Sequence, residues 1–165
     1  AYASFVVSFV CGLLYMFTWK SVVPPREILD EINYRSVIIG FPMLSAGIFT
    51  GAVWAHYAWG SYWSWDPKET WALVTVLIYS FVAHMRFIPG FRGNFAYSFA
   101  SLISFSSVLM TYFGVNYYLS GLHSYAKGDP VPVPTFVYYT VAVVAVVSIL
   151  AFITNRRFNN VKPAE

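Results

Sequence analysis

The sequence is poor in charged residues and in cysteine, and each shortage restricts what the protein can be. Only 10% of its 165 residues are Asp, Glu, Lys or Arg, against roughly a quarter in soluble domains. A chain that is 58% apolar and 21% aromatic cannot cover a surface that faces water. We therefore predict an all-α membrane protein: a polytopic transmembrane helix bundle that forms one domain over residues 1–165 and contacts the lipid bilayer.

The single cysteine, Cys11, excludes an internal disulfide and any metal site built from several cysteines. The net charge of +3 is small, and no basic run is interleaved with aromatic residues, so we expect no nucleic acid among the partners. The chain begins at Ala1 without a methionine or a basic leader. We expect it to be the C-terminal part of a longer protein, with its first apolar run acting as a membrane span rather than as a signal peptide.

Lys and Arg residues indicate the orientation of the spans. About five apolar segments are long enough to cross a bilayer, for which roughly 20 helical residues are needed. The predicted spans place eight basic residues on one side of the membrane and only Lys68 and Lys127 on the other. Because cytoplasmic loops carry the excess of Lys and Arg, we expect the N-terminus outside and the C-terminus inside. The predicted spans are residues 1–19, 36–55, 69–88, 95–118 and 134–154.

Tryptophan is concentrated in one short stretch. Five of the six tryptophans fall within residues 54–71, called the tryptophan segment below. Three explanations are open from composition alone. One is an aromatic belt that anchors the protein at the lipid headgroups, and a second is ordinary packing between spans. The third is a platform for a large, flat, apolar ligand, because indole faces stack on other flat π-systems. The predicted orientation places this segment and the connection at 119–133 on the same outer face.

The charged tetrapeptide 66–69 is typical of a helix start. Asp66 can act as the N-cap, and Pro67 suits the first helical position because its missing N–H costs nothing there. Glu69 then falls three residues after the cap, as in a capping box. Capping accounts for both carboxylates, and a catalytic pair of acids is the alternative. In the preceding span, Gly40 and Gly47 provide small residues for close helix packing.

The three histidines lie in different places. His56 is inside the tryptophan segment, His84 is near the inner end of the third span, and His123 follows the outer end of the fourth. Three scattered histidines with no cysteine partner make a poor zinc site. An imidazole beside an aromatic surface instead suggests an axial ligand to a metal in a flat ring, and histidine commonly ligates haem iron.

Residues 59–73, which read WGSYWSWDPKETWAL, resemble the tryptophan-rich signature of the haem-handling cytochrome c assembly proteins of the CcsA/ResC (system II) type. Residues 29–35 and 114–125 are also similar to that family. The resemblance implies transport of haem b to the outer face of the bacterial cytoplasmic (inner) membrane. It also implies presentation of that haem, with a ResB/CcsB-type membrane partner, to the Cys-x-x-Cys-His motif of an apocytochrome c.

The resemblance further assigns roles to individual residues. His123 would be an axial ligand of haem iron at the outer face, and His84 would ligate haem iron in a transmembrane site. The family's first outer-face histidine would precede Ala1, and His56 matches no ligand position, so we expect His56 to be a surface or packing residue. No catalytic residue is implied. The expected haem-binding residues are Trp59, Trp63, Trp65, Asp66, Trp71, His84 and His123.

Two other functions are compatible with the residues themselves. A structural or quinone-contacting subunit of a respiratory complex would use the tryptophans as an interfacial belt. An intramembrane hydrolase would depend on Asp66 and Glu69. Whether the chain is itself an enzyme is left open, because the family implies only a haem-handling component of a cytochrome c synthase.

Overall fold

The computed structural model describes residues 1–17 and 24–119, together with scattered positions between 135 and 153. Among these residues the structure is helical and contains no strand, so the predicted all-α membrane bundle is confirmed. The elements are α1 (Tyr2–Phe17), α2 (Arg26–Trp59), α3 (Pro67–His84), the short 3-10 helix η1 (Met85–Phe87), α4 (Asn94–Leu109), the π-helical turn η2 (Met110–Gly114) and α5 (Val115–Tyr118).

Within the described part of the chain, three helical stretches are long and apolar enough to cross a membrane. They are Arg26–Trp59, Pro67–Phe87 and Asn94–Gly114. A shorter apolar helix, Tyr2–Met16, corresponds to the first predicted span. Within the fifth predicted span, 134–154, the structure describes 12 of the 21 positions, and all 12 are helical. The orientation of the termini relative to a membrane stays a prediction.

Helix α2 begins ten residues earlier than the span predicted at 36–55. It runs from Arg26 to Trp59 without interruption, with Pro25 at its N-cap and Pro42 inside it. Its 34 residues correspond to about 51 Å, more than the roughly 30 Å of a hydrocarbon core. The polar residues of its first turns stay helical because Asp30 and Asn33 are buried against the other helices, which apolar periodicity alone does not reveal.

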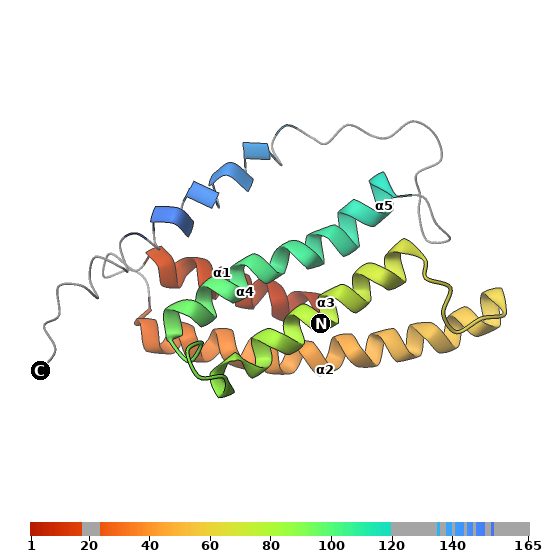
Figure 1. Cartoon of the computed structure of the whole chain (residues 1–165), viewed down its shortest axis with the longest axis horizontal. Helices are drawn as coiled ribbons and strands as arrows, with labels where there is room; N and C mark the ends of the chain where they lie inside the picture. The colour runs from red at the N-terminus through yellow and green to blue at the C-terminus, as the bar shows by residue number, and fades with distance from the viewer. Residues whose placement is uncertain are drawn as a thin grey trace, which may run out of the picture.

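The helices lie side by side, with α1 packed between α2 and α4, and α3 packed against α2 and α4. Figure 1 shows the link between α2 and α3 at one end of the bundle and the link between α3 and α4 at the other. Phe5 and Tyr79 stack in the core with ring centroids 3.7 Å apart. A Cβ at Gly40 would lie 2.6 Å from the Phe5 ring, so this glycine permits the close approach of α1 to α2.

Buried polar side chains also join the helices. Asn33 accepts a hydrogen bond from Ser8 Oγ at 2.6 Å and donates one to Ser101 Oγ at 2.9 Å. Asp30 Oδ2 lies 2.6 Å from Arg86 Nη2. These contacts connect α1, α2 and α4 and tie α2 to the turn after α3. Hydrogen bonds of this kind hold transmembrane helices together where the hydrophobic effect cannot.

Candidate functional site

The turn between α2 and α3 has a defined geometry at both ends. Helix α2 ends at Trp59 because Gly60 adopts a left-handed conformation with φ of 79°, which glycine does without steric cost. Trp65 is the only non-glycine residue with positive φ (57°) among the described residues. A bulky side chain seldom adopts this conformation. This left-handed residue falls immediately before Asp66, the N-cap of α3.

The predicted capping box at the start of α3 is present. The Lys68 amide donates to Asp66 Oδ2 at 3.2 Å, and the Asp66 amide donates to Glu69 Oε2 at 3.3 Å. The same Glu69 oxygen accepts from the Ser64 amide at 2.8 Å. Both carboxylates therefore stabilise the helix start and the turn before it, and both lie near the positive end of the helix dipole.

Three of the five indoles of the tryptophan segment, Trp54, Trp59 and Trp65, are exposed, and the neighbouring rings are not coplanar. Trp65 is 69% exposed and Trp54 is 57% exposed. The Trp63 and Trp65 rings meet at 88° with centroids 5.7 Å apart, and the Trp54 and Trp59 rings meet at 82° and 4.9 Å. Each pair thus offers one ring face with the edge of a second ring beside it. A flat ligand can stack on one member of a pair while the other member borders it.

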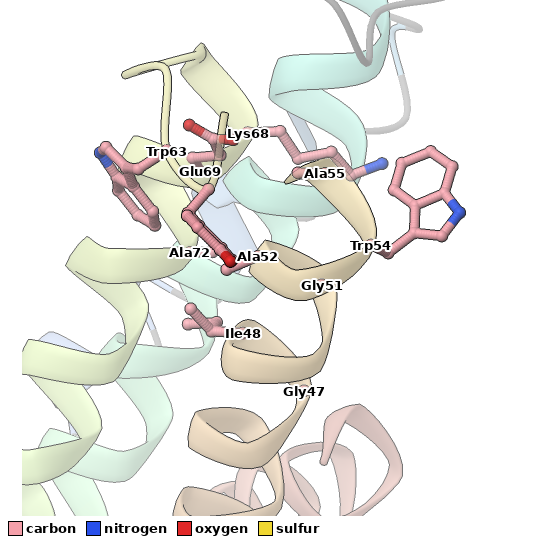
Figure 2. Close-up of a pocket in the computed structure, with 11 residues that line it drawn as sticks. Gly47, Ile48, Gly51, Ala52, Trp54, Ala55, Trp63, Lys68, Glu69 and Ala72 are labelled. Carbon is pink, nitrogen blue, oxygen red and sulfur yellow. The ribbon is translucent and has the colours of Figure 1, made fainter. Parts of the chain in front are cut away.

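A pocket of about 220 Å³ lies between α2 and α3, beside this segment. Figure 2 shows Trp63 and Trp54 on opposite sides of it, with Lys68 extended across the top. Its volume is below the roughly 300–1,000 Å³ typical of small-molecule sites, so it can enclose only part of a large ligand. Its lining residues are Gly47, Ile48, Gly51, Ala52, Trp54, Ala55, Tyr62, Trp63, Lys68, Glu69 and Ala72.

Of the predicted haem-binding tryptophans, only Trp63 lines this pocket. Trp59 and Trp65 lie along the turn next to it. Trp71 is half-buried in α3, and its carbonyl oxygen accepts hydrogen bonds from Thr75 Oγ1 at 2.9 Å and Thr111 Oγ1 at 3.2 Å. Trp71 therefore sits at the junction of α3 with η2. The sequence analysis did not identify Gly51, Ala52 and Tyr62 as lining residues, because no local pattern marks a pocket between two helices.

His84 lies at the other end of α3 from the tryptophan segment. The helix has 18 residues, so His84 lies about 27 Å along its axis from the helix start. The imidazole is exposed, and its Nδ1 is 2.7 Å from the Ser80 carbonyl oxygen. Since a carbonyl oxygen only accepts, Nδ1 carries a proton, and in the neutral ring the lone pair is then on Nε2. This is the tautomer that a metal-ligating histidine requires.

His56 packs as the sequence analysis expected. Its ring stacks on Tyr62 with centroids 4.2 Å apart and an interplanar angle of 4°. Its Nδ1 is buried, with no hydrogen-bond partner in the described part of the chain. Tyr62 lines the pocket and His56 does not, so His56 contributes to the site through its contact with Tyr62.

His123 lies outside the described residues. Seven residues before it in the sequence is Asn116. The Oδ1 atom of Asn116 accepts a hydrogen bond from Lys68 Nζ at 3.3 Å. Helix α5 is therefore joined to the rim of the pocket two residues before its last residue, Tyr118.

The chain is similar to known proteins over most of its length. The family described as "Cytochrome C assembly protein" matches residues 1–123. Protein NrfI of Wolinella succinogenes is 49% identical over 108 residues, which are 66% of this chain and 12% of that protein. The cytochrome c biogenesis proteins CcsA of Gloeobacter violaceus and Cyanophora paradoxa are each 50% identical, over 60% and 64% of this chain and 29% and 32% of their own. The chain thus spans a third or less of the length of these relatives.

Proposed function

The chain belongs to the cytochrome c assembly protein family, and from this premise we propose that it carries haem b to the outer face of the membrane and presents it for attachment to apocytochrome c. The observation that supports this most is the exposed indole surface at the end of α2, beside an apolar pocket that Lys68 borders. Apolar residues, aromatic faces and one cation match a flat apolar ring with two carboxylates.

In this proposal haem is the cargo, and the tryptophan segment is its outer-face platform. Trp63 and Trp65 contact the porphyrin, with Trp59 beside them. Asp66 and Trp71 hold the segment in place through the cap of α3 and its junction with η2, and Lys68 pairs with a propionate. The 220 Å³ pocket is too small for a whole porphyrin, so the ring lies mainly over the turn rather than inside the bundle.

His123 is the proposed axial ligand at this platform. The contact between Lys68 and Asn116 supports the assignment, because it joins the chain leading to His123 to the rim of the pocket. His84 is the proposed ligand of a separate haem within the membrane, and its Nε2 lone pair supports that role. A second axial ligand at the platform would come from a residue outside this sequence.

The chemistry of attachment is the addition of two cysteine thiols to the haem vinyl groups, which requires ferrous haem and reduced thiols together. Axial ligation contributes to the iron potential, and the protein supplies orientation. The proposed partners are a ResB/CcsB-type membrane protein and an apocytochrome c with a Cys-x-x-Cys-His motif. The proposed location is the bacterial cytoplasmic membrane, with the platform on the periplasmic side.

The test is the absorbance spectrum of the full-length protein purified from membranes. We expect a haem Soret band, a weaker band in His123→Ala, and partial recovery when imidazole is added. His56→Gln is the comparison variant: it removes a ring that stacks on Tyr62 rather than a proposed iron ligand, so the band should fall less than in His123→Ala. An unchanged spectrum in His123→Ala would remove that ligand from the proposal. A colourless wild-type protein would favour the structural or quinone-contacting alternative.

A further inference from the structure

A π-helical turn, η2, interrupts the helix that leads from α4 to α5. The Val115 amide donates to the Met110 carbonyl oxygen, five residues earlier, where an α-helix would use the carbonyl of Thr111. Such turns are rare and frequently lie at functional sites. Figure 1 shows α5 continuing the line of α4 toward the end of the bundle at which α3 begins.

The π-turn sets the side of the helix on which Asn116 lies. Thr111 and Asn116 are five residues apart, the spacing that a π-turn closes with a hydrogen bond, so they lie on roughly the same side. In an unbroken α-helix the same spacing would separate them by about 140° around the axis. The apolar Val115 would then follow Thr111 on that side, and Asn116 would be turned away from it.

That side of the helix meets a single face of α3. Thr111 Oγ1 lies 3.0 Å from Thr75 Oγ1 and 3.2 Å from the Trp71 carbonyl oxygen. Lys68 Nζ donates to Asn116 Oδ1 at 3.3 Å. Lys68, Trp71 and Thr75 are three and four residues apart, so they share one face of α3. The threonine contact is buried, whereas Asn116 is half-buried at the edge of the bundle.

The direction of α5 depends on these contacts. It has only four residues, too few to be stable as a helix by itself. Glu69 lies beside Lys68 in the pocket lining, but its Oε2 accepts hydrogen bonds from the amides of Ser64 and Asp66. Neighbouring residues on a helix also point in different directions. The Lys68 ammonium group therefore reaches across to Asn116 and ties α5 to the start of α3.

We propose that Thr111 and Asn116 are positioning residues for the outer-face site. Through the π-turn they hold α5 against the start of α3, and so they set the direction in which the chain leaves α5 toward His123, the proposed iron ligand. This inference rests on the proposed function. It adds two residues that act on the ligand through the backbone, without touching haem.

The test is a double-mutant cycle with His123 in the full-length protein, with haem retention measured from the Soret band. We expect Asn116→Leu to lower retention about fivefold. Added imidazole should recover it, because imidazole can replace an axial ligand that is misplaced. In a His123→Ala background, Asn116→Leu should cause no further loss, since both changes remove the same interaction.

Conservative variants separate positioning from folding. Asn116→Asp keeps an acceptor for Lys68, and Thr111→Ser keeps the buried hydroxyl, so both should retain haem as the wild type does. Thr111→Val keeps the shape but loses the hydroxyl, and should lower retention with the same recovery by imidazole. Ser106→Ala is the matched control, because its hydroxyl donates to the Ile103 carbonyl on the exposed side of α4. Its loss should leave retention unchanged.

The thermal unfolding temperature of Asn116→Leu should stay close to that of the wild type, because the residue lies at the edge of the bundle. If it falls, the smaller change Asn116→Ser provides the same comparison. Wild-type retention in the Asn116 variants, a loss that adds to that of His123→Ala, or a loss that imidazole does not recover overturns the inference and leaves the proposed function standing. A wild-type protein that retains no haem would reject both.

Discussion

The two ends of the helical bundle differ in the partners that their side chains find. At the end with Asp30 and Arg86, polar side chains are buried and contact one another across helices. The Arg86 guanidinium pairs with Asp30 Oδ2 at 2.6 Å and lies 4.2 Å from the Tyr34 ring centroid and 5.0 Å from that of Tyr97. At the end with the tryptophan segment, large aromatic side chains are exposed beside an open pocket.

This difference separates the end that its own side chains hold together from the end that we propose binds a ligand. Arg86 lies close to two aromatic rings and beside the Asp30 carboxylate. These contacts within the chain hold the turn after α3 in place. In the described part of the chain the Lys68 ammonium group donates to the neutral side-chain amide of Asn116, and Trp63 and Trp65 pack edge to face. The tryptophan end is therefore where an external molecule has the most to gain by binding.

The largest effect is expected at Arg86. Arg86→Ala removes the partner of a buried carboxylate, which should lower the free energy of unfolding by about 2–3 kcal/mol. Arg35→Ala is the matched control, because Arg35 pairs with Glu31 on an exposed face, where such pairs contribute about 0.3–0.5 kcal/mol. Unfolding in mixed detergent micelles measures both. Equal losses would show that burial does not distinguish the two ion pairs.

The glycines of α2 provide the next comparison. Gly40→Ala would press a methyl group into the Phe5 ring and should cost about 2 kcal/mol through overpacking. Gly47→Ala meets open space and should stabilise the helix by about 0.5–1 kcal/mol. Thermal unfolding of the two variants should therefore shift in opposite directions. A loss of stability in Gly47→Ala would mean that another part of the protein packs on that face.

Trp63 tests the other end of the bundle. Trp63→Ala removes the aromatic wall of the pocket and should weaken haem retention about tenfold, which is about 1.4 kcal/mol. Helix content and detergent resistance should change little, because the turn is capped independently by Asp66 and Glu69. Trp63→Phe keeps a ring and should retain most of the haem. Haem retention equal to wild type in Trp63→Ala would instead support an interfacial belt.

The smallest expected effect is at the cap. Asp66→Ala removes the acceptor of the Lys68 amide and should cost about 1 kcal/mol of stability. Asp66→Asn keeps an acceptor and should restore most of it. Loss of haem-dependent function in Asp66→Asn, with stability unchanged, would show that this residue does more than cap the helix. It would support the alternative in which the carboxylate is catalytic.

Sequence reasoning succeeded where the controlling interactions are local. The low charge predicted a membrane bundle, the spacing of Asp66 and Glu69 predicted the capping box, and the family signature predicted a cytochrome c assembly protein. It failed at the start of α2, because the polar residues at 26–35 read as a connection. Their helical state depends on burial of Asp30 and Asn33 against α1, α4 and Arg86, which are distant in the chain.

By itself, the sequence determined the helical class, the capped start of α3 and the family, because hydropathy, capping and motif spacing act over a few neighbouring residues. Only the tertiary structure decided that the paired indoles meet nearly at right angles and that Lys68 lines a pocket between two helices. It also decided that an added Cβ would clash with Phe5 at Gly40 and would meet no atom at Gly47. These features depend on how far apart the helices lie and how they face one another, and that is set by contacts between residues far apart in the chain.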